Sequence, residues 1–258
     1  MKGAESIFID KKAKIGVLML HGFTSTPFQF REVAEYLAQK KYTVFAPLIA
    51  GHGTTPADLA KTTIEEWKKS VEDAYLKLKR SVQKIIIVGN SFGGNLAFYL
   101  ARRFPESTVA VISLGTPVKI RFQKIIKIRY YLYGWMKKYY RKPRRIYKID
   151  YTDMADEVTY PLIPIKSLMR FFQFIREETI PNLRSVKAPV LVMHASVDPV
   201  VHPGSAIYIY ENLGSSCKRI YWLNAREHII TDKERRREVV EKALQFIEEI
   251  IRNHQKKQ

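Results

Sequence analysis

Short apolar runs alternate along the chain with longer segments in which apolar residues recur every three or four positions. The short runs are rich in β-branched residues and nearly continuous in apolar side chains, which is typical of strands buried on both faces of a sheet. The longer segments have the period of amphipathic helices. This alternation predicts the α/β fold class, with mostly parallel strands joined by crossover helices.

The predicted elements follow one another in a regular order. Strands are expected at residues 16–20, 42–46, 84–89, 108–113, 190–194 and 218–223. Helices are expected at residues 28–40, 64–80, 92–104, 204–213 and 233–251. Thr63 and Glu66 have the spacing of a capping box, and Thr231 and Asp232 are cap candidates for the last helix.

The alternation of strands and helices stops between residues 117 and 181, a stretch rich in lysine, arginine and aromatic residues. We interpret this stretch as an inserted cap, or lid. A chain of 258 residues is too short for two ordinary enzyme domains and a linker. We therefore expect residues 1–258 to form one domain, with residues 117–181 as an insertion within it.

The strongest chemical signal is the pentapeptide Gly89-Asn90-Ser91-Phe92-Gly93, which follows a predicted strand and precedes a predicted helix. That context is the one required of a nucleophile elbow, in which a serine lies on a tight strand-to-helix turn. The turn brings neighbouring residues so close that glycine is needed on both sides of the serine. Ser91 is therefore the predicted nucleophile.

A serine hydroxyl needs a general base, and the base needs an acid to orient it. In this fold the chain order is serine, then acid, then histidine. Asp198 follows the predicted strand at 190–194, and His228 follows the strand at 218–223, so we assign the acid and the base to them. Alternatively, Asp198 is a simple turn residue before Pro199, and His228 a surface residue before a helix.

Two further carboxylates near the histidine, Glu227 and Asp232, compete with Asp198 for the acid role, although Asp232 more simply caps the last helix. The negative charge of a tetrahedral intermediate also needs backbone N–H donors. One is expected from Phe92, next to the nucleophile, and the other from Phe23 in the loop after the first predicted strand. His21 in that loop is expected to hold the loop rather than to carry protons.

With these motifs the chain resembles the bacterial thermostable carboxylesterase and monoacylglycerol lipase family of α/β-hydrolases. The resemblance covers nearly the whole chain and rests on the segments His21-Gly22-Phe23-Thr24 and Gly51-His52-Gly53, on Trp67, and on the surroundings of Ser91, Asp198 and His228. It implies a central, mostly parallel sheet with a small lid over the site. It also implies hydrolysis of short- to medium-chain esters without a cofactor.

Composition narrows the remaining possibilities. No apolar run reaches the length of a membrane-spanning helix, and the N-terminal stretch lacks a cleavage site, so we expect a cytoplasmic protein. Cys217 is the only cysteine, which rules out an internal disulfide, and the histidines lack the spacing of a metal site. We therefore expect no metal. Abundant lysine, glutamate, arginine and isoleucine, with little asparagine or glutamine, fit a thermophilic source.

The net charge of +19 is concentrated in the cap, where residues 119–148 carry twelve Lys and Arg, six Tyr and no Asp or Glu. Apolar side chains at helical spacing in this segment predict one stripe that packs down, formed by Ile125, Ile128, Leu132, Trp135 and Tyr139. The cationic face is either simply solvated or attracts anionic lipid. Nucleic-acid binding is a further alternative. No recognised nucleic-acid-binding module accompanies the charge, however, so no specific nucleic-acid binding is expected.

A second cap stretch has helical spacing and either lines an acyl pocket or forms a core face; the pocket candidates are Ile165, Met169 and Phe172. The function expected is that of a serine carboxylesterase acting on a small-molecule ester through an acyl-enzyme. Alternatives are a monoacylglycerol lipase acting at lipid interfaces, a thioesterase or peptidase with the same machinery, and a binding module for anionic surfaces. The oligomeric state is not readable from the sequence.

Overall fold

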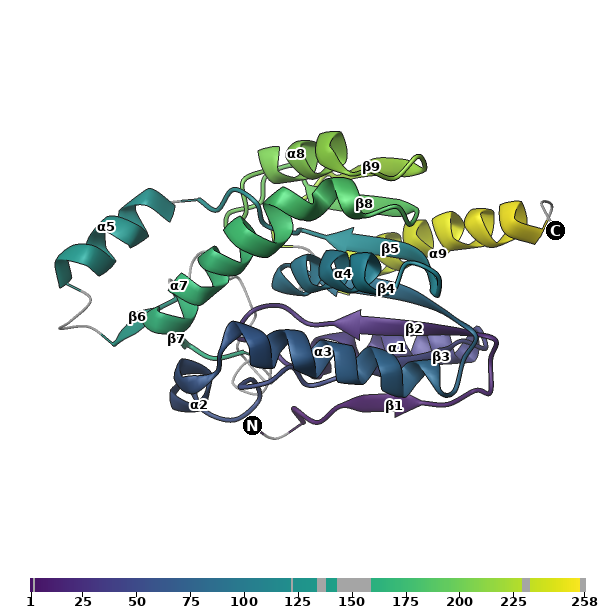
Figure 1. Ribbon diagram of the computed structural model, residues 1–258, viewed down its shortest axis with the longest axis horizontal. Helices are drawn as coiled ribbons and strands as arrows, with labels where there is room; N and C mark the ends of the chain where they lie inside the picture. Colours follow the sequence, from purple (N-terminus) through teal and green to yellow (C-terminus); the bar gives the residue numbers. More distant parts are fainter. Residues whose placement is uncertain (2, 122, 134–137, 143–158, 229–232, 256–258) are drawn as a thin grey trace.

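The centre of the molecule is a seven-stranded sheet (Figure 1). The computed structural model describes residues 1, 3–121, 123–133, 138–142, 159–228 and 233–255. Within these residues the strand order is β1-β3-β2-β4-β5-β8-β9. The strands are β1 (Ile7–Ile9), β2 (Ile15–Leu20), β3 (Thr43–Ala46), β4 (Lys84–Asn90), β5 (Thr108–Leu114), β8 (Val190–Ala195) and β9 (Lys218–Leu223).

All neighbouring strands from β3 to β9 are parallel, and β1 pairs antiparallel with β3 at one edge. The predicted α/β fold with a mostly parallel sheet is confirmed. Strand β1 was not predicted, because three residues are too few to show the alternation of apolar and polar side chains that is typical of a strand. Antiparallel pairing needs no crossover helix, so this edge strand left no trace in the alternation.

Both faces of the sheet are covered by helices. One face carries α3 (Ile64–Lys79), α4 (Phe92–Arg103) and α8 (Gly204–Asn212), and the other carries α1 (Arg31–Gln39) and α9 (Lys233–Gln255) (Figure 1). Consecutive strand residues therefore enter different cores: Leu18 and Ile87 pack on the first face, and Val17 and Ile86 on the second. This is why the strands read as continuous apolar runs.

The helix starts follow their caps. The predicted capping box of α3 is present, with the Thr63 hydroxyl accepting from the Glu66 N–H and the Glu66 carboxylate accepting from the Thr63 N–H. Thr231 and Asp232 lie outside the described residues. The short helix α2 (Pro56–Lys61), which begins after the capping residue Thr55, was not predicted, because it has too few residues to show helical periodicity.

Between β5 and β8 the chain leaves the sheet. This part contains α5 (Gln123–Tyr133), the short antiparallel pair β6 (Tyr139–Arg141) and β7 (Leu162–Pro164), and α7 (Ile165–Phe174). Helix α7 contacts α2 and α3, whereas α5 projects away from the sheet (Figure 1). The cap boundaries at 117 and 181 remain a prediction.

The prediction that one apolar stripe of the cap packs down is wrong for the residues that the structure describes. Ile125, Ile128 and Leu132 on α5 are 50%, 57% and 58% exposed. Helix α5 ends at Tyr133, so Tyr139 lies on strand β6 instead of continuing the stripe, and Trp135 lies outside the described residues. The spacing correctly indicated a helix, but periodicity alone does not supply a second layer to cover its apolar face.

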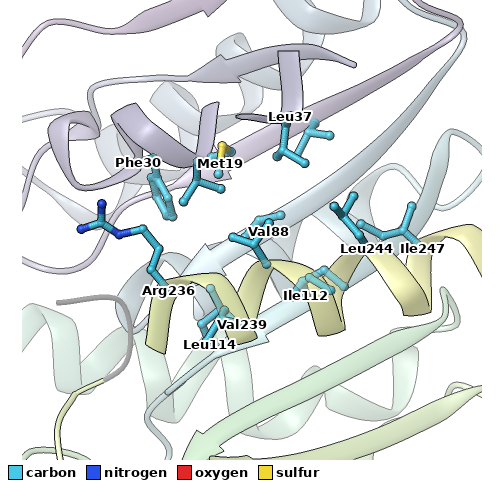
Figure 2. Close-up of a pocket in the computed structure, with 14 residues that line it drawn as sticks. Met19, Phe30, Leu37, Val88, Ile112, Leu114, Arg236, Val239, Leu244 and Ile247 are labelled. Atoms are coloured by element: carbon cyan, nitrogen blue, oxygen red, sulfur yellow. The ribbon is translucent and has the colours of Figure 1, made fainter. Parts of the chain in front are cut away.

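A small apolar cavity of about 40 Å³ lies on the side of the sheet covered by α1 and α9 (Figure 2). Its walls include Met19, Val88 and Leu114 from the sheet and Val239 from α9. Arg236 stands at its edge and pairs with Glu32 of α1. The cavity lies on the opposite face of the sheet from α3, α4 and α8.

Candidate active site

Ser91 lies on the turn between β4 and α4, with φ 52° and ψ −117°. This left-handed backbone conformation is unusual for a residue with a Cβ. It is held by hydrogen bonds on both sides: Ser91 N–H donates to the Leu114 carbonyl at 2.7 Å, and Gly94 N–H donates to the Ser91 carbonyl at 2.9 Å. The pentapeptide therefore forms a tight strand-to-helix turn in the structure.

The glycines on either side of Ser91 make this turn possible. A Cβ on Gly89 would lie 2.3 Å from the carbonyl oxygen of Gly93, and a Cβ on Gly93 would lie 1.9 Å from the carbonyl oxygen of Leu20. Both distances are far shorter than any real contact, so side chains are excluded at these positions. The second approach also brings the start of α4 directly against the end of β2.

Asp198 and His228 meet at the end of the sheet. The Nδ1 of His228 lies 2.6 Å from Oδ2 of Asp198, and the Asp198 side chain is fully buried. The other carboxylate oxygen accepts from the N–H groups of Val200 and Val201, at 2.7 and 2.9 Å. Arg121 donates to the Asp198 main-chain carbonyl at 2.8 Å. The acid loop is thus fixed independently of the histidine.

Burial and charge oppose each other in this pair. Burial by itself would lower the pKa of His228, but the Asp198 charge and its hydrogen bond outweigh burial and raise that pKa. For Asp198, burial would raise the pKa, whereas the His228 charge, the hydrogen bond from its ring and the two backbone donors lower it. The carboxylate is therefore held ionised, and it stabilises a protonated imidazole beside it.

The backbone after β5 connects this pair to the nucleophile. Leu114, the last residue of β5, accepts the hydrogen bond from Ser91 N–H. At the next residue, Gly115, a Cβ would lie 3.2 Å from Cε1 of His228 and 3.7 Å from Oδ2 of Asp198. The three predicted catalytic residues are thus gathered around one short stretch of backbone at the carboxyl ends of the strands.

The loop after β2 lies beside the nucleophile. A Cβ on Gly22 would be 3.5 Å from Cβ of Ser91. His21 is buried, with Nδ1 3.0 Å from the Gly22 carbonyl oxygen and Nε2 3.1 Å from the Ile49 backbone nitrogen. Both ring nitrogens therefore hold the loop, as expected for a structural histidine. Burial lowers the pKa of His21 well below its ordinary value, so the ring is neutral.

Aromatic rings surround the two predicted oxyanion residues. The rings of Phe23 and Phe92 meet edge to face with centroids 5.9 Å apart, and Trp67 of α3 contacts both. Phe171 of α7 stacks on Phe23 at 5.0 Å and meets Phe92 edge-on at 5.2 Å. Through this ring, α7 packs against both predicted oxyanion residues.

The predicted acyl-pocket residues Ile165, Met169 and Phe172 all lie on α7. Phe172 is buried, and Ile165 and Met169 are half-buried. Their assignment to an acyl pocket stays a prediction. Phe171 was not predicted from the sequence as a site residue. It lies three residues after Leu168, another buried residue of α7, and could have been recognised from that helical spacing.

The described part of the chain contains no group of three or more His, Cys, Asp or Glu side chains arranged to hold a metal ion. Within the same residues, every helix is too short or too polar to cross a membrane. The absence of cofactors from the reaction stays a prediction.

A parallel sheet with a serine on a strand-to-helix turn, an aspartate after a later strand and a histidine after the last strand defines hydrolases of the α/β-hydrolase fold. The chain belongs to the family described as serine aminopeptidase, S33, whose model matches residues 11–235. The central, mostly parallel sheet expected from the sequence resemblance is confirmed, and the lid over the site stays a prediction.

The known relatives of this chain include two bacterial enzymes. Over 95% of both proteins it is 31% identical to the thermostable monoacylglycerol lipase of Bacillus sp. (strain H-257). It is 28% identical to the carboxylesterase of Bacillus subtilis (strain 168), over 88% of this chain and 90% of that enzyme. The predicted resemblance to carboxylesterases and monoacylglycerol lipases is therefore confirmed.

Solved structures show the same architecture. One solved structure has a description that names LipS and LipT, two metagenome-derived lipolytic enzymes. It matches with a TM-score of 0.86 and 27% identity, over 96% of this chain and 99% of that one. The monoacylglycerol lipase of Paleococcus ferrophilus matches with a TM-score of 0.77 over 95% and 97% of the two chains; at 19% identity, this match supports the fold alone.

Proposed function

We propose that this protein is a serine ester hydrolase in which Ser91 is the nucleophile, His228 the general base and Asp198 the acid that orients it. The observation that carries the proposal is the 2.6 Å contact between Asp198 and His228, at the end of the sheet where Ser91 occupies the elbow. The relatives named carboxylesterase and monoacylglycerol lipase support an ester as the substrate.

In the proposed reaction, His228 accepts the Ser91 proton while Ser91 Oγ attacks the ester carbonyl. The N–H groups of Phe23 and Phe92 stabilise the resulting oxyanion, and Asp198 stabilises the imidazolium. His228 then donates its proton to the departing alcohol, which leaves an acyl group on Ser91. Water, activated by the same histidine, attacks this acyl-enzyme and releases the carboxylic acid.

A fluorophosphonate probe tests the nucleophile. Mass spectrometry of the labelled protein is expected to locate one adduct, on Ser91, and Ser91→Ala is expected to lose both the adduct and the hydrolysis of p-nitrophenyl butyrate. Ser113→Ala is a matched control, because this buried serine on β5 lies outside the elbow. An adduct on another residue, or full activity of Ser91→Ala, contradicts the proposal.

Short- to medium-chain esters are the proposed substrates, and the competing candidate is a monoacylglycerol at a lipid interface. One observation favours the interface: α5 exposes Ile125, Ile128 and Leu132 within a segment that carries only basic charges. Basic amphipathic helices bind anionic lipid surfaces through such a combination. In this second candidate, α5 brings the enzyme to the lipid while α7 covers the site.

A substrate series separates the candidates. Hydrolysis rates are compared for p-nitrophenyl esters of increasing chain length and for monoacylglycerols, the latter in neutral vesicles and in vesicles containing anionic lipid. An interfacial lipase is expected to prefer monoacylglycerol and to be activated by the anionic vesicles, whereas a carboxylesterase prefers the soluble esters. Since the same machinery also serves thioesterases and peptidases, an acyl thioester and a peptide anilide complete the series.

Binding to anionic surfaces without catalysis is the rival from another class. An intact Asp198–His228 pair argues against it, since a pure binding module has no use for a histidine oriented by a buried carboxylate. If Ser91→Ala retains vesicle binding while the wild-type protein hydrolyses none of the substrates, binding is the function.

For the proposed ester hydrolase we also propose a cytoplasmic location.

A further inference from the structure

A buried lysine fastens the cap to the loop that carries the predicted oxyanion residue Phe23. Lys142 directly follows β6, and only 7% of it is exposed. Its Nζ lies 2.5 Å from the hydroxyl of Thr24 and 2.5 Å from the hydroxyl of Thr159. Lysine is rarely buried without specific partners, because removing its charge from water costs several kcal/mol.

Thr24 is the residue after Phe23, and its backbone is strained. Its φ of +65° is left-handed, which is a genuine outlier for a β-branched residue. Such strain costs about 1 to 3 kcal/mol and persists only where the surroundings hold it in place. The Thr24 hydroxyl donates to the Phe23 carbonyl at 2.5 Å, so the conformation of Thr24 is coupled to the Phe23–Thr24 peptide, which directly follows the peptide that carries the Phe23 N–H.

The cap holds Thr24 from several directions. Besides Lys142, the Tyr160 N–H and the Thr159 hydroxyl each donate to the Thr24 carbonyl, both at 3.0 Å. Ser25 forms an isolated antiparallel bridge with Thr159. Lys142 is the charged residue among these contacts, and its Nζ contacts both Thr24 of the loop and Thr159 of the cap.

The position of Lys142 also connects it to the catalytic centre. Burial lowers the pKa of His52, and the positive charge of Lys142 acts in the same direction. At His228 the charge of Lys142 also acts to lower the pKa, but Asp198 outweighs burial and Lys142 and raises that pKa. Burial lowers the pKa of Lys142 itself to about 7. The charge of Lys142 is thus one of the influences on the predicted general base.

We propose that Lys142 is a positioning residue for ester hydrolysis, which sets the direction of the Phe23 N–H by holding Thr24 against the cap. This inference rests on the proposed function and extends it to a residue outside the triad and the oxyanion donors. The cap thereby shapes the oxyanion hole as well as covering it.

The test uses Lys142→Met, which keeps an unbranched side chain, one atom shorter, and removes its donors, with Lys138→Met as the matched control. Lys138 is exposed and lies four residues earlier in the same segment. For a soluble p-nitrophenyl ester, Lys142→Met is expected to lower kcat about 10- to 100-fold, less than the roughly 100- to 1000-fold loss of an oxyanion donor. KM is expected to change less than about threefold, because the acyl contacts remain.

A trifluoromethyl ketone, which forms a tetrahedral adduct with the nucleophile, gives a second readout. Its inhibition constant is expected to rise by the same factor as kcat/KM falls, since both report binding of the oxyanion. A purely structural role for Lys142 lowers the thermal midpoint without this parallel change. Lys138→Met is expected to match the wild-type protein in every measurement.

If Lys142→Met does not fold, Thr159 decides the question. Thr159→Val removes the hydroxyl that accepts from Lys142 and donates to the Thr24 carbonyl, and it is expected to lower kcat. Thr159→Ser keeps the hydroxyl and is expected to retain the wild-type kcat. Wild-type kcat in Lys142→Met or in Thr159→Val, or a change confined to KM, overturns the inference. A wild-type protein without ester hydrolysis would instead refute the proposed function, so the two failures are distinguishable.

Discussion

The end of the sheet that carries the proposed catalytic residues and the predicted cap are held in place in different ways. Around Ser91 the backbone is locked by contacts that exclude even a methyl group at Gly89 and Gly93, and by hydrogen bonds to Leu114 and Gly94. In the cap, α5 exposes its apolar residues, and the cap is tied to the oxyanion loop by polar contacts of Lys142, Thr159 and Tyr160. The first region fixes its geometry by close backbone packing. The second combines the apolar packing of α7, whose Phe171 stacks on Phe23, with a few polar contacts.

This difference separates two tasks. Ser91 depends on strand ends that a two-sided core holds in place, whereas the loop of Asp198 also receives a hydrogen bond from Arg121, at the start of the predicted cap. The loop after β2, which carries Phe23, lies between the two regions. Phe23 packs against Trp67 of α3, in the body formed by the sheet and its helices, and against Phe171 of the cap. Changes in the body should therefore alter the chemical step most, while changes in the cap should alter how well the loop and the substrate are placed.

The largest effect is expected at the catalytic pair. Asp198→Asn should lower kcat about 10⁴-fold, because the imidazole loses the group that fixes its tautomer and stabilises its charge. The variant also loses the carboxylate that raises the pKa of His228. Since the general base must be neutral, the acidic limb of kcat/KM against pH should move to lower pH. Asp58→Asn, at an exposed helix start, is the control and should leave the profile unchanged.

A smaller effect is expected on the free energy of unfolding, through Lys142, which connects the cap to the loop after β2. The pKa of Lys142 is about 7 in the folded protein against 10.5 for an ordinary lysine, so the unfolded chain binds one more proton between these values. The free energy of unfolding should therefore rise with pH from about 7 to 10, by at most about 1.4 kcal/mol per unit from this residue. Urea denaturation at several pH values should show this slope in Lys138→Met but not in Lys142→Met. Equal slopes in the two variants would contradict the assignment.

The strain at the elbow offers a comparison within the body. Ser91→Gly removes the Cβ from a residue with φ 52° and should raise the free energy of unfolding by about 1 kcal/mol, after the added flexibility of the unfolded chain is subtracted. Ser91→Ala keeps the Cβ and should not gain this stability. Both variants should be inactive, so denaturation curves separate strain from catalysis. Equal stability of the two would mean that the turn stores no such strain.

The smallest effect on stability is expected in the cap helix. Ile128→Ser with Leu132→Ser should change the free energy of unfolding by less than about 0.5 kcal/mol, because both side chains are already exposed. If α5 binds lipid, the same pair of changes should lower the rate on monoacylglycerol vesicles several-fold and leave soluble esters unaffected. Ile207→Ser is the control, because Ile207 on α8 is also exposed, at 46%. Unchanged vesicle activity in the double variant would remove α5 from the interface.

Local patterns along the chain were sufficient to predict the central fold and the residues of the candidate site. The strands at 16–20, 84–89 and 190–194 were predicted within a residue or two of their ends, because buried strands read as apolar runs whichever face each residue takes. The elbow could be predicted from five consecutive residues, since its glycines are required by contacts within the turn and with the neighbouring strand. Asp198 and His228 could be found because chain order and strand ends predict where they meet.

The contacts of the cap, in contrast, were decided only by the tertiary structure. The spacing of Ile125, Ile128 and Leu132 is that of a helix packed on a core, yet only the placement of α5 determines whether a second layer covers them. Lys142 is one of twelve basic residues in its segment, and nothing local distinguishes it from Lys138. It becomes distinct through Thr24, 118 residues away in the chain. Sequence patterns record the local period and the turn chemistry of a segment, whereas the partners of a polar side chain depend on which distant segments the fold brings beside it.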